Sequence, residues 1–291
     1  MTDVAFFARH EVHVGKDLGG RRVTIGDDDV RRYGDGTGGP AARVPLPDGT
    51  AAAPALLFHS EVYRSLAWYL PNVFGNLHAR QEWELFAPLA VGATVRTRST
   101  VVERYRKRNR DYVVNEVLVT DDDGRWLQRS RTHQSFLVED EPRAEVVVDR
   151  DRERRSDRRF DVGEGAGEEV APLRRPIAIA MCQAFSGPEK NYHTDREMAR
   201  MLGFPDIVVQ GMMSICMVSE LMTHAFGLGW LLAGKLDVRL VNVVWVGDVL
   251  TTRGKLREEL PEGAKRRAVL DVWCEKADGT KTLVGTASAL R

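Results

Sequence analysis

Short runs in which apolar and polar residues alternate fill the later part of each half of the chain. Such alternation, with Val, Thr and aromatic residues enriched, predicts strands that bury one face. In the first half these runs cover residues 94–105, 112–120 and 126–138. In the second half they cover residues 236–246, 249–256, 267–275 and 280–290. Turn residues separate neighbouring runs, so we expect antiparallel strands.

Each half also contains one segment with apolar residues at helical spacing, at residues 60–70 and at residues 211–226. Upstream of these segments, residues 22–33 and 175–185 hold equivalent places, and a glycine turn follows each of them. The same order of predicted elements thus occurs in both halves, which predicts a tandem duplication. We expect an α+β fold in which two antiparallel sheets each wrap a central helix and the two repeats pack face to face as a pseudo-dimer.

A segment dense in charges of both signs separates the two repeats. It is poor in aromatic residues and rich in glycine, so it cannot bury enough apolar area to form a core element. We therefore expect a first domain at residues 1–140, a charged linker at 141–172 and a second domain at 173–291. A solvated linker is the simpler interpretation of this segment, and a patch that binds a partner is the alternative.

Composition excludes several classes of protein. The 42 basic and 42 acidic residues cancel, whereas a nucleic-acid-binding protein usually has a basic excess. No apolar run approaches the ~20 residues that cross a bilayer, and the first residues lack the apolar core of a signal peptide. Three cysteines without metal-like spacing suit a reducing compartment. We expect a cytoplasmic protein with no membrane contact, no metal and no redox cofactor.

Two short stretches of the second half carry a family resemblance. The first reads Phe185-Ser-Gly-Pro-Glu-Lys-Asn-Tyr-His-Thr-Asp195, and the second reads Gln210-Gly-Met212 at the start of the long apolar segment. Together they resemble the signature of the MaoC-like hot-dog enzymes, which include the (R)-specific enoyl-CoA hydratases and related acyl-thioester dehydratases. The first half resembles the non-catalytic partner domain of that group at residues 75–82, 88–92 and 119–124. The resemblance implies a double hot-dog with a degenerate first half and an active second half.

The sequence departs from the family pattern at the catalytic aspartate, where it has Pro188. The family's asparagine, proline and second histidine are replaced by Lys190, Asn191 and Gln210. The resemblance assigns the remaining roles to residues at matching positions. They are His193 as acid/base, Gly211 as the backbone donor to the thioester carbonyl, and Ser214 as a polar residue on the first helical turn.

The chemistry of hydration gives these residues a physical rationale. Adding water across an enoyl thioester needs a base for the water and donors where enolate charge develops. A histidine suits the first task, and a helix that begins with glycine offers free N–H groups for the second. Glu189 follows the missing aspartate, and we predict that it returns a carboxylate to the same water. The alternative is that Glu189 is only an exposed turn residue. In that case Asn191 or Tyr192 would assist His193 instead.

Other residues are weaker candidates. His59 and His78 could face the interface between the halves, and the basic hairpin at residues 104–110 could meet coenzyme A phosphates. Four aromatic residues of the first half could shape an acyl tunnel, namely Phe58, Tyr63, Trp68 and Tyr69. Glu220 is the acid on the central helix that a thioesterase would need.

The sequence therefore predicts a hydratase or dehydratase of a 2-enoyl or 3-hydroxyacyl thioester. The substrate is carried on coenzyme A or an acyl carrier protein, whose phosphopantetheine belongs to the substrate rather than to a cofactor. A thioesterase, a non-catalytic thioester-binding protein, and another lyase or isomerase of specialised metabolism stay open. Both a monomer and a homodimer fit the tandem arrangement.

Overall fold

The computed structural model of the chain describes residues 12–66, 77–107, 110–137, 160, 162–164 and 166–291. Within these ranges no helix is both long and apolar enough to cross a membrane. Most of the predicted charged linker, at residues 141–159, lies outside the described residues. Its last residues are described, and the Val170 N–H donates to the Gly254 carbonyl oxygen at 2.9 Å.

The described residues of the first half form five strands and two helices. They are β1 (Asp17–Thr24), α1 (Asp27–Thr37), α2 (Glu61–Leu66), β2 (Leu77–Leu85), β3 (Thr94–Lys107), β4 (Arg110–Asp121) and β5 (Trp126–Leu137). The strands predicted at residues 94–105, 112–120 and 126–138 correspond to the last three. The helix predicted at 60–70 is described as far as Leu66, and its remaining residues lie outside the described part.

The second half repeats this order of strands and adds helices. Its elements are β6 (Leu173–Pro176), α4 (Ile179–Ser186), α5 (Arg196–Met201), α6 (Gly211–Phe226), α7 (Leu228–Ala233), β7 (Lys235–Leu240), β8 (Val249–Glu262), β9 (Lys265–Lys276) and β10 (Lys281–Leu290). The long helix predicted at residues 211–226 is confirmed at both ends.

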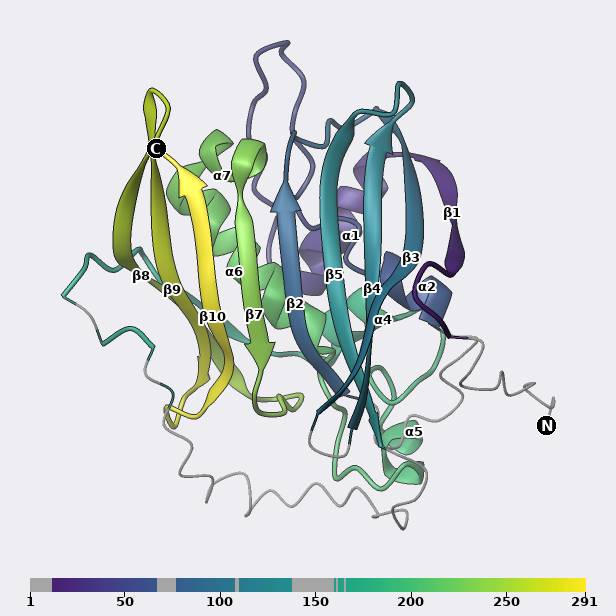
Figure 1. Cartoon of the computed structure of the whole chain (residues 1–291). Coiled ribbons are helices and arrows are strands. Elements are labelled where there is room, and N and C mark those ends of the chain that lie inside the picture. Colours follow the sequence, from purple (N-terminus) through teal and green to yellow (C-terminus); the bar gives the residue numbers. More distant parts are fainter. Residues whose placement is uncertain (1–11, 67–76, 108–109, 138–159, 161, 165) are drawn as a thin grey trace.

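All ten strands form one antiparallel sheet in the order β1-β3-β4-β5-β2-β7-β10-β9-β8-β6 (Figure 1). Read from its outer edge inward, the first half runs 1-3-4-5-2 and the second half runs 6-8-9-10-7. The two orders are the same when equivalent strands are matched. The chain is therefore an α+β double hot-dog. The sheets of the two repeats join edge to edge, where β2 hydrogen-bonds with β7, so the predicted face-to-face packing of the repeats was wrong.

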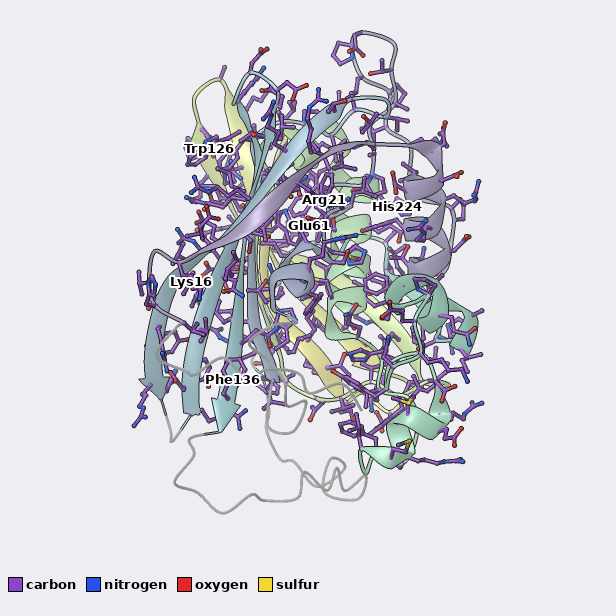
Figure 2. All side chains as sticks on the ribbon, turned by 90° about the vertical axis from the view of Figure 1, so that its right-hand side faces the viewer. Lys16, Arg21, Glu61, Trp126, Phe136 and His224 are labelled. Carbon is purple, nitrogen blue, oxygen red and sulfur yellow. The ribbon has the colours of Figure 1, made fainter. Side chains whose placement is uncertain are left out.

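The helices cover one face of the sheet, which Figure 2 shows from the side. Residues Met212–Met222 of α6 are all buried, because this helix is enclosed by the sheet and by neighbouring helices. Helices α1 and α4 pack against each other across the boundary between the halves. Gly36 of α1 permits this contact, because a Cβ at that position would lie only 2.9 Å from the Phe185 ring of α4.

The strand predicted at residues 236–246 is shorter than expected, because β7 ends at Leu240. The residues that follow leave the sheet and pair instead with the segment that leads into α6. Val209 donates its N–H to the Val244 carbonyl oxygen at 2.9 Å, and Val208 forms a bridge with Trp245. This pairing fixes the backbone just before the first turn of α6.

Candidate active site

The loop that links α4 to α5 is held in shape by the side chain of Asn191. Its Oδ1 accepts the His193 N–H at 2.8 Å, and its Nδ2 donates to the carbonyl oxygens of Ser186 and Glu189 at 3.0 and 3.1 Å. The amide group is thus fully used within the loop. Asn191 positions the loop residues, and its side chain has little capacity left for a substrate.

His193 is oriented by the backbone. Its Nδ1 lies 2.7 Å from the Val208 carbonyl oxygen, and a carbonyl oxygen can only accept. In the neutral ring the proton must therefore sit on Nδ1, which leaves a lone pair on Nε2. Burial lowers the pKa of His193 to about 4, although the bond to Val208 opposes this shift. At neutral pH the residue is an uncharged base with a defined tautomer.

Helix α6 begins three residues after this anchor. Gln210 is the N-cap, and Gly211 is the first helical residue. The N–H groups of Gly211 and Met212 have no acceptor among the described residues, whereas the Met213 N–H donates to the Gln210 carbonyl oxygen at 2.9 Å. These first N–H groups carry the positive end of the helix dipole. A Cβ on Gly211 would lie 2.3 Å from Leu240 Cδ1, so glycine allows the β7 side chain to pack directly on the helix start.

Two predicted residues lie close by but are less accessible. The Tyr192 ring packs on the imidazole of His193 with 3.8 Å between ring centroids, and burial raises the pKa of Tyr192 to about 12. Ser214 is 1% exposed, and its hydroxyl has no hydrogen-bond partner among the described residues. Ser214 therefore faces the interior of the protein in this structure.

The retained acid of the motif, Asp195, has a structural task. It caps α5 by accepting the N–H groups of Glu197 and Met198 at 3.0 and 3.1 Å. The bond from Met198, followed by the nearby Lys190 ammonium, lowers the pKa of Asp195. Its carboxylate is committed to the helix end and to the Lys190 ion pair at 3.2 Å.

A cavity of about 550 Å³ lies between the first half and the motif loop. The second half contributes residues from the end of α4, the loop that follows it and the N-cap of α6, namely Ala184–Glu189 and Gln210. The first half contributes β1, α1 and α2, with Arg21, Val23, Ile25, Asp29, Arg32, Tyr33, Leu57–Glu61, Tyr63 and Arg64. Glu189 and Gln210 therefore face this space, whereas His193 is not among the lining residues. Glu189 and His193 are thus close in sequence, but of these two residues only Glu189 lies on the cavity wall.

Glu189 is exposed at the edge of the cavity. Only its backbone carbonyl oxygen takes part in the loop, where it accepts from Asn191 and from the Thr194 hydroxyl. Its carboxylate makes no ion pair or hydrogen bond with the described residues. Pro188, at the place of the family's aspartate, is exposed beside it.

The first half contributes a chain of polar groups behind Tyr63. The Tyr63 hydroxyl lies 3.3 Å from His78 Nδ1, and His78 Nε2 lies 3.1 Å from Gln81 Oε1. Since Gln81 Oε1 accepts, His78 carries its proton on Nε2 and receives the Tyr63 hydroxyl on Nδ1. Burial lowers the pKa of His78 to about 4. His78 thus supports Tyr63 at the cavity wall instead of lining the cavity itself.

Two ion pairs frame the site and were not predicted from the sequence. Arg21 on β1 binds Glu61 on α2, and both line the cavity (Figure 2). Arg175 on β6 forms two bonds of 2.7 Å with Glu220 on α6 and donates to the Thr37 carbonyl oxygen at 2.6 Å. Neither pair has a local signal, because the partners are distant in sequence and meet only through packing.

The basic hairpin is more engaged than a free phosphate-binding patch would be. Arg104 pairs with the buried Asp111 and donates to the Val12 carbonyl oxygen at 3.0 Å. Arg110 donates to the Ser135 hydroxyl at 2.9 Å. Residues 108–109 lie outside the described part. Among the described residues, no group of three or more His, Cys, Asp or Glu is arranged to hold a metal ion.

Comparison with known families gives a match over the motif. Residues 161–269 match the family described as MaoC like domain. This range contains the α4–α5 loop, His193 and the start of α6. A comparison with curated protein sequences gives no match.

Solved structures match nearly the whole chain at low identity. A MaoC-like dehydratase from Phytophthora capsici is 15% identical, with 98% of both chains covered and a TM-score of 0.69. Peroxisomal multifunctional enzyme type 2 from Drosophila melanogaster is 17% identical, with 94% of this chain and 48% of that chain covered and a TM-score of 0.62. A Mycobacterium tuberculosis protein described as a double hotdog fold is 15% identical, with 97% of both chains covered and a TM-score of 0.62. The predicted family resemblance is confirmed: the second half of the chain carries a MaoC-like domain, and the whole chain has the double hot-dog fold.

Proposed function

We propose that the protein is a hydratase or dehydratase of an acyl thioester carried on coenzyme A or an acyl carrier protein. The observation that carries this proposal is the fixed tautomer of His193, whose Nδ1 is bonded to the Val208 carbonyl oxygen. The same backbone segment continues into the N-terminus of α6. One piece of chain thus holds both the His193 ring and the first N–H groups of α6, and we assign to them the roles of base and oxyanion donors.

In the hydration direction, His193 Nε2 takes a proton from water while the water oxygen bonds to the β-carbon of the enoyl group. The electron pair of the double bond moves toward the thioester, and negative charge develops on its oxygen. The Gly211 N–H and the dipole of α6 stabilise this enolate. The proton that His193 took from the water is then transferred to the α-carbon, which restores the neutral imidazole and completes the addition, and dehydration is the reverse sequence.

Glu189 is the proposed carboxylate partner in this proton transfer. It lies at the cavity edge, and its carboxylate makes no hydrogen bond or ion pair with a described residue. Gln210, also on the cavity wall, is proposed to contact the substrate, with Tyr192 packed behind His193. Asn191 holds the loop in shape. Ser214 is proposed as a polar residue on the first turn of α6 that faces the interior of the protein.

The first half is proposed to cover the acyl group. Most of the residues that line the cavity come from β1, α1 and the segment around α2. Phe58 and Tyr63, which the sequence suggested for this task, are among them. Trp68 and Tyr69, which it also suggested, lie outside the described residues. The proposed substrate carries its own phosphopantetheine, and the proposal requires no further cofactor.

The direct test is hydration of crotonyl-CoA by the wild type, His193→Ala and Glu189→Gln, followed as loss of enoyl absorbance. Turnover that depends on His193 supports the proposal. No turnover of any enoyl thioester by the folded wild type would refute it. Tight binding of a thioester without turnover would instead identify a binding protein, a role that Pro188 at the aspartate position favours.

A thioesterase is disfavoured by the surroundings of Glu220. This carboxylate is 6% exposed and is held by Arg175 through two hydrogen bonds. It does not line the cavity. A carboxylate held in this way is not free to activate water.

A further inference from the structure

One side chain of the cavity is left without a partner. His59 lies on the cavity wall, is 8% exposed, and comes from the turn before α2. Its ring stacks on Phe185, with 4.2 Å between centroids and 17° between planes, and Tyr33 lies 5.9 Å away on another side. The imidazole is thus clamped between aromatic rings from both halves of the protein.

The two ring nitrogens of His59 differ in access. Nδ1 is sealed from solvent and has no hydrogen-bond partner among the described residues. Nε2 has no partner among them either, but it is not sealed. Because His59 lines the cavity, Nε2 is the atom that a ligand can reach.

An unpartnered buried nitrogen costs about 1–3 kcal/mol, so a histidine here requires an explanation. A phenylalanine would stack on Phe185 equally well and would avoid that cost. Burial lowers the pKa of His59 to about 3, so the ring is neutral at physiological pH. Buried N–H groups without acceptors are rarer than buried acceptors without donors. The proton therefore belongs on Nε2, where the cavity can supply an acceptor.

Neighbouring groups of the cavity also offer donors. Arg32 on α1 is exposed and makes no ion pair with a described residue. Of the acids on this side, Glu61 accepts from Arg21 and Thr97, and Asp29 accepts the Gly26 N–H at 2.9 Å through Oδ2. Arg32 and His59 Nε2 are donors that no described residue uses. A ligand that binds to both must present acceptors such as oxygen atoms.

We propose that the cavity selects acyl thioesters whose acyl group carries an additional oxygen acceptor, and that His59 Nε2 donates to that oxygen. The inference rests on the proposed thioester chemistry and narrows its substrate class from plain aliphatic chains to oxygenated ones. A ketone or hydroxyl oxygen suits the neutral imidazole. A carboxylate would need Arg32 as well.

The experiment compares four six-carbon enoyl-CoA substrates of equal length. One is plain trans-hexenoyl-CoA, and the others carry a ketone, a hydroxyl or a terminal carboxylate beyond the double bond. A hydrogen bond of ordinary strength predicts that kcat/KM of the wild type is about tenfold higher for an oxygenated substrate than for the plain one. The ketone, hydroxyl and carboxylate arms identify the kind of oxygen.

The informative variant is His59→Phe, which keeps the stack on Phe185 and removes the donor. It should reduce the preference for the oxygenated substrate by about tenfold, whereas His59→Gln, which keeps an N–H, should restore part of it. His224→Gln is the matched control, because His224 lies near the end of α6 and does not line the cavity (Figure 2). Thermal unfolding of each variant checks that it is folded.

Binding of saturated analogues by isothermal titration calorimetry gives a readout that does not depend on turnover. Tighter binding of an oxohexanoyl-CoA than of hexanoyl-CoA, lost in His59→Phe, supports the inference even if the protein hydrates nothing. Equal binding of the two by the wild type overturns it. A uniform loss of affinity for all thioesters in His59→Phe also overturns it, since His59 would then contact the pantetheine amides instead of the acyl group.

Discussion

The imidazole of His193 owes its orientation to a backbone carbonyl, at 2.7 Å from Nδ1 to the Val208 oxygen. A carboxylate in that place would raise the basicity of the ring, whereas a neutral carbonyl does so only weakly. Burial therefore affects the pKa of His193 more than the hydrogen bond does, and this pKa is about 4. The proposed base is weak but is deprotonated throughout the physiological range.

Replacing His193 by Gln should lower kcat for enoyl-CoA hydration by about 10²–10³-fold, the usual contribution of a positioned base. KM should change less, because the N-terminus of α6 and the cavity wall are untouched. Steady-state kinetics with crotonyl-CoA measures both, and His224→Gln serves as the control. A loss of less than tenfold would remove His193 from the role of base.

Replacing Glu189 by Gln should lower kcat by at least tenfold, because the proposed proton transfer loses its carboxylate. Glu197→Gln is the matched control, since Glu197 is an exposed acid on the neighbouring α5. Both variants should unfold at the wild-type temperature. Equal activity of Glu189→Gln and the control would show that position 189 is only a surface turn.

Motif spacing predicted that a helix begins at Gly211, and α6 begins there with Gln210 as its N-cap. It did not predict that His193 would be absent from the cavity lining. The tasks of Asn191 and Asp195 were not predictable in the same way. Both side chains turned out to satisfy backbone groups of the loop and of α5. The cavity wall formed by Arg21 and Tyr33 has no local signature. The place of Arg21 on β1 depends on its ion pair with Glu61 of α2, and that of Tyr33 depends on how α1 packs against α4.

Among the elements, α6 is tied to its surroundings by one buried ion pair. Arg175 of β6 holds Glu220 of α6 and the C-terminal end of α1 at Thr37. Breaking such a pair leaves an uncompensated charge in the interior. The pair therefore fixes the central helix relative to both halves, although it takes no part in the proposed chemistry.

Glu220→Gln should lower the free energy of unfolding by about 3 kcal/mol, because Arg175 loses its counter-charge in a largely buried place. Chemical denaturation measures this loss. The double variant Arg175→Met with Glu220→Leu should recover part of it, since no unpaired charge remains. A single variant as stable as the wild type would contradict the buried pair.

The alternation of apolar and polar residues located most strands, but it missed β2. Its sequence is dominated by charged and polar residues, which normally argue against an interior strand. The structure accounts for them by pairing across strands, as between Arg80 and Asp237 on β7 at 2.7 Å and between Arg129 on β5 and Glu84 at 2.9 Å. These partners are brought together by the fold, so the pattern of β2 alone could not reveal them.

At the scale of the whole molecule, three buried histidines link stability to pH. Burial lowers the pKa values of His59, His78 and His193 to about 3, 4 and 4. In the unfolded chain the pKa of each of these groups is about 6.5. Between these values the unfolded state binds more protons than the folded state, so acidification favours unfolding.

The free energy of unfolding should therefore be largest above about pH 6.5 and fall as the pH drops toward 4. Each histidine contributes at most about 1.4 kcal/mol per pH unit in that window. Urea denaturation at a series of pH values measures the slope. His59→Phe should reduce the slope, and a flat profile between pH 6.5 and 4.5 would contradict neutral buried histidines.

The pairing of β2 with β7 has a consequence for behaviour at low concentration. Two separate hot-dog subunits would meet by association, and their shared cavity would vanish when dilution separates them. Here both repeats lie on one chain, so their effective concentration for each other does not depend on the amount of protein. Specific activity per chain should stay constant from micromolar to sub-nanomolar enzyme, as initial rates over a dilution series would show. Tethering also relieves the first repeat of any need to keep a second copy of the loop between α4 and α5, which leaves its residues free for the proposed contacts with the acyl group.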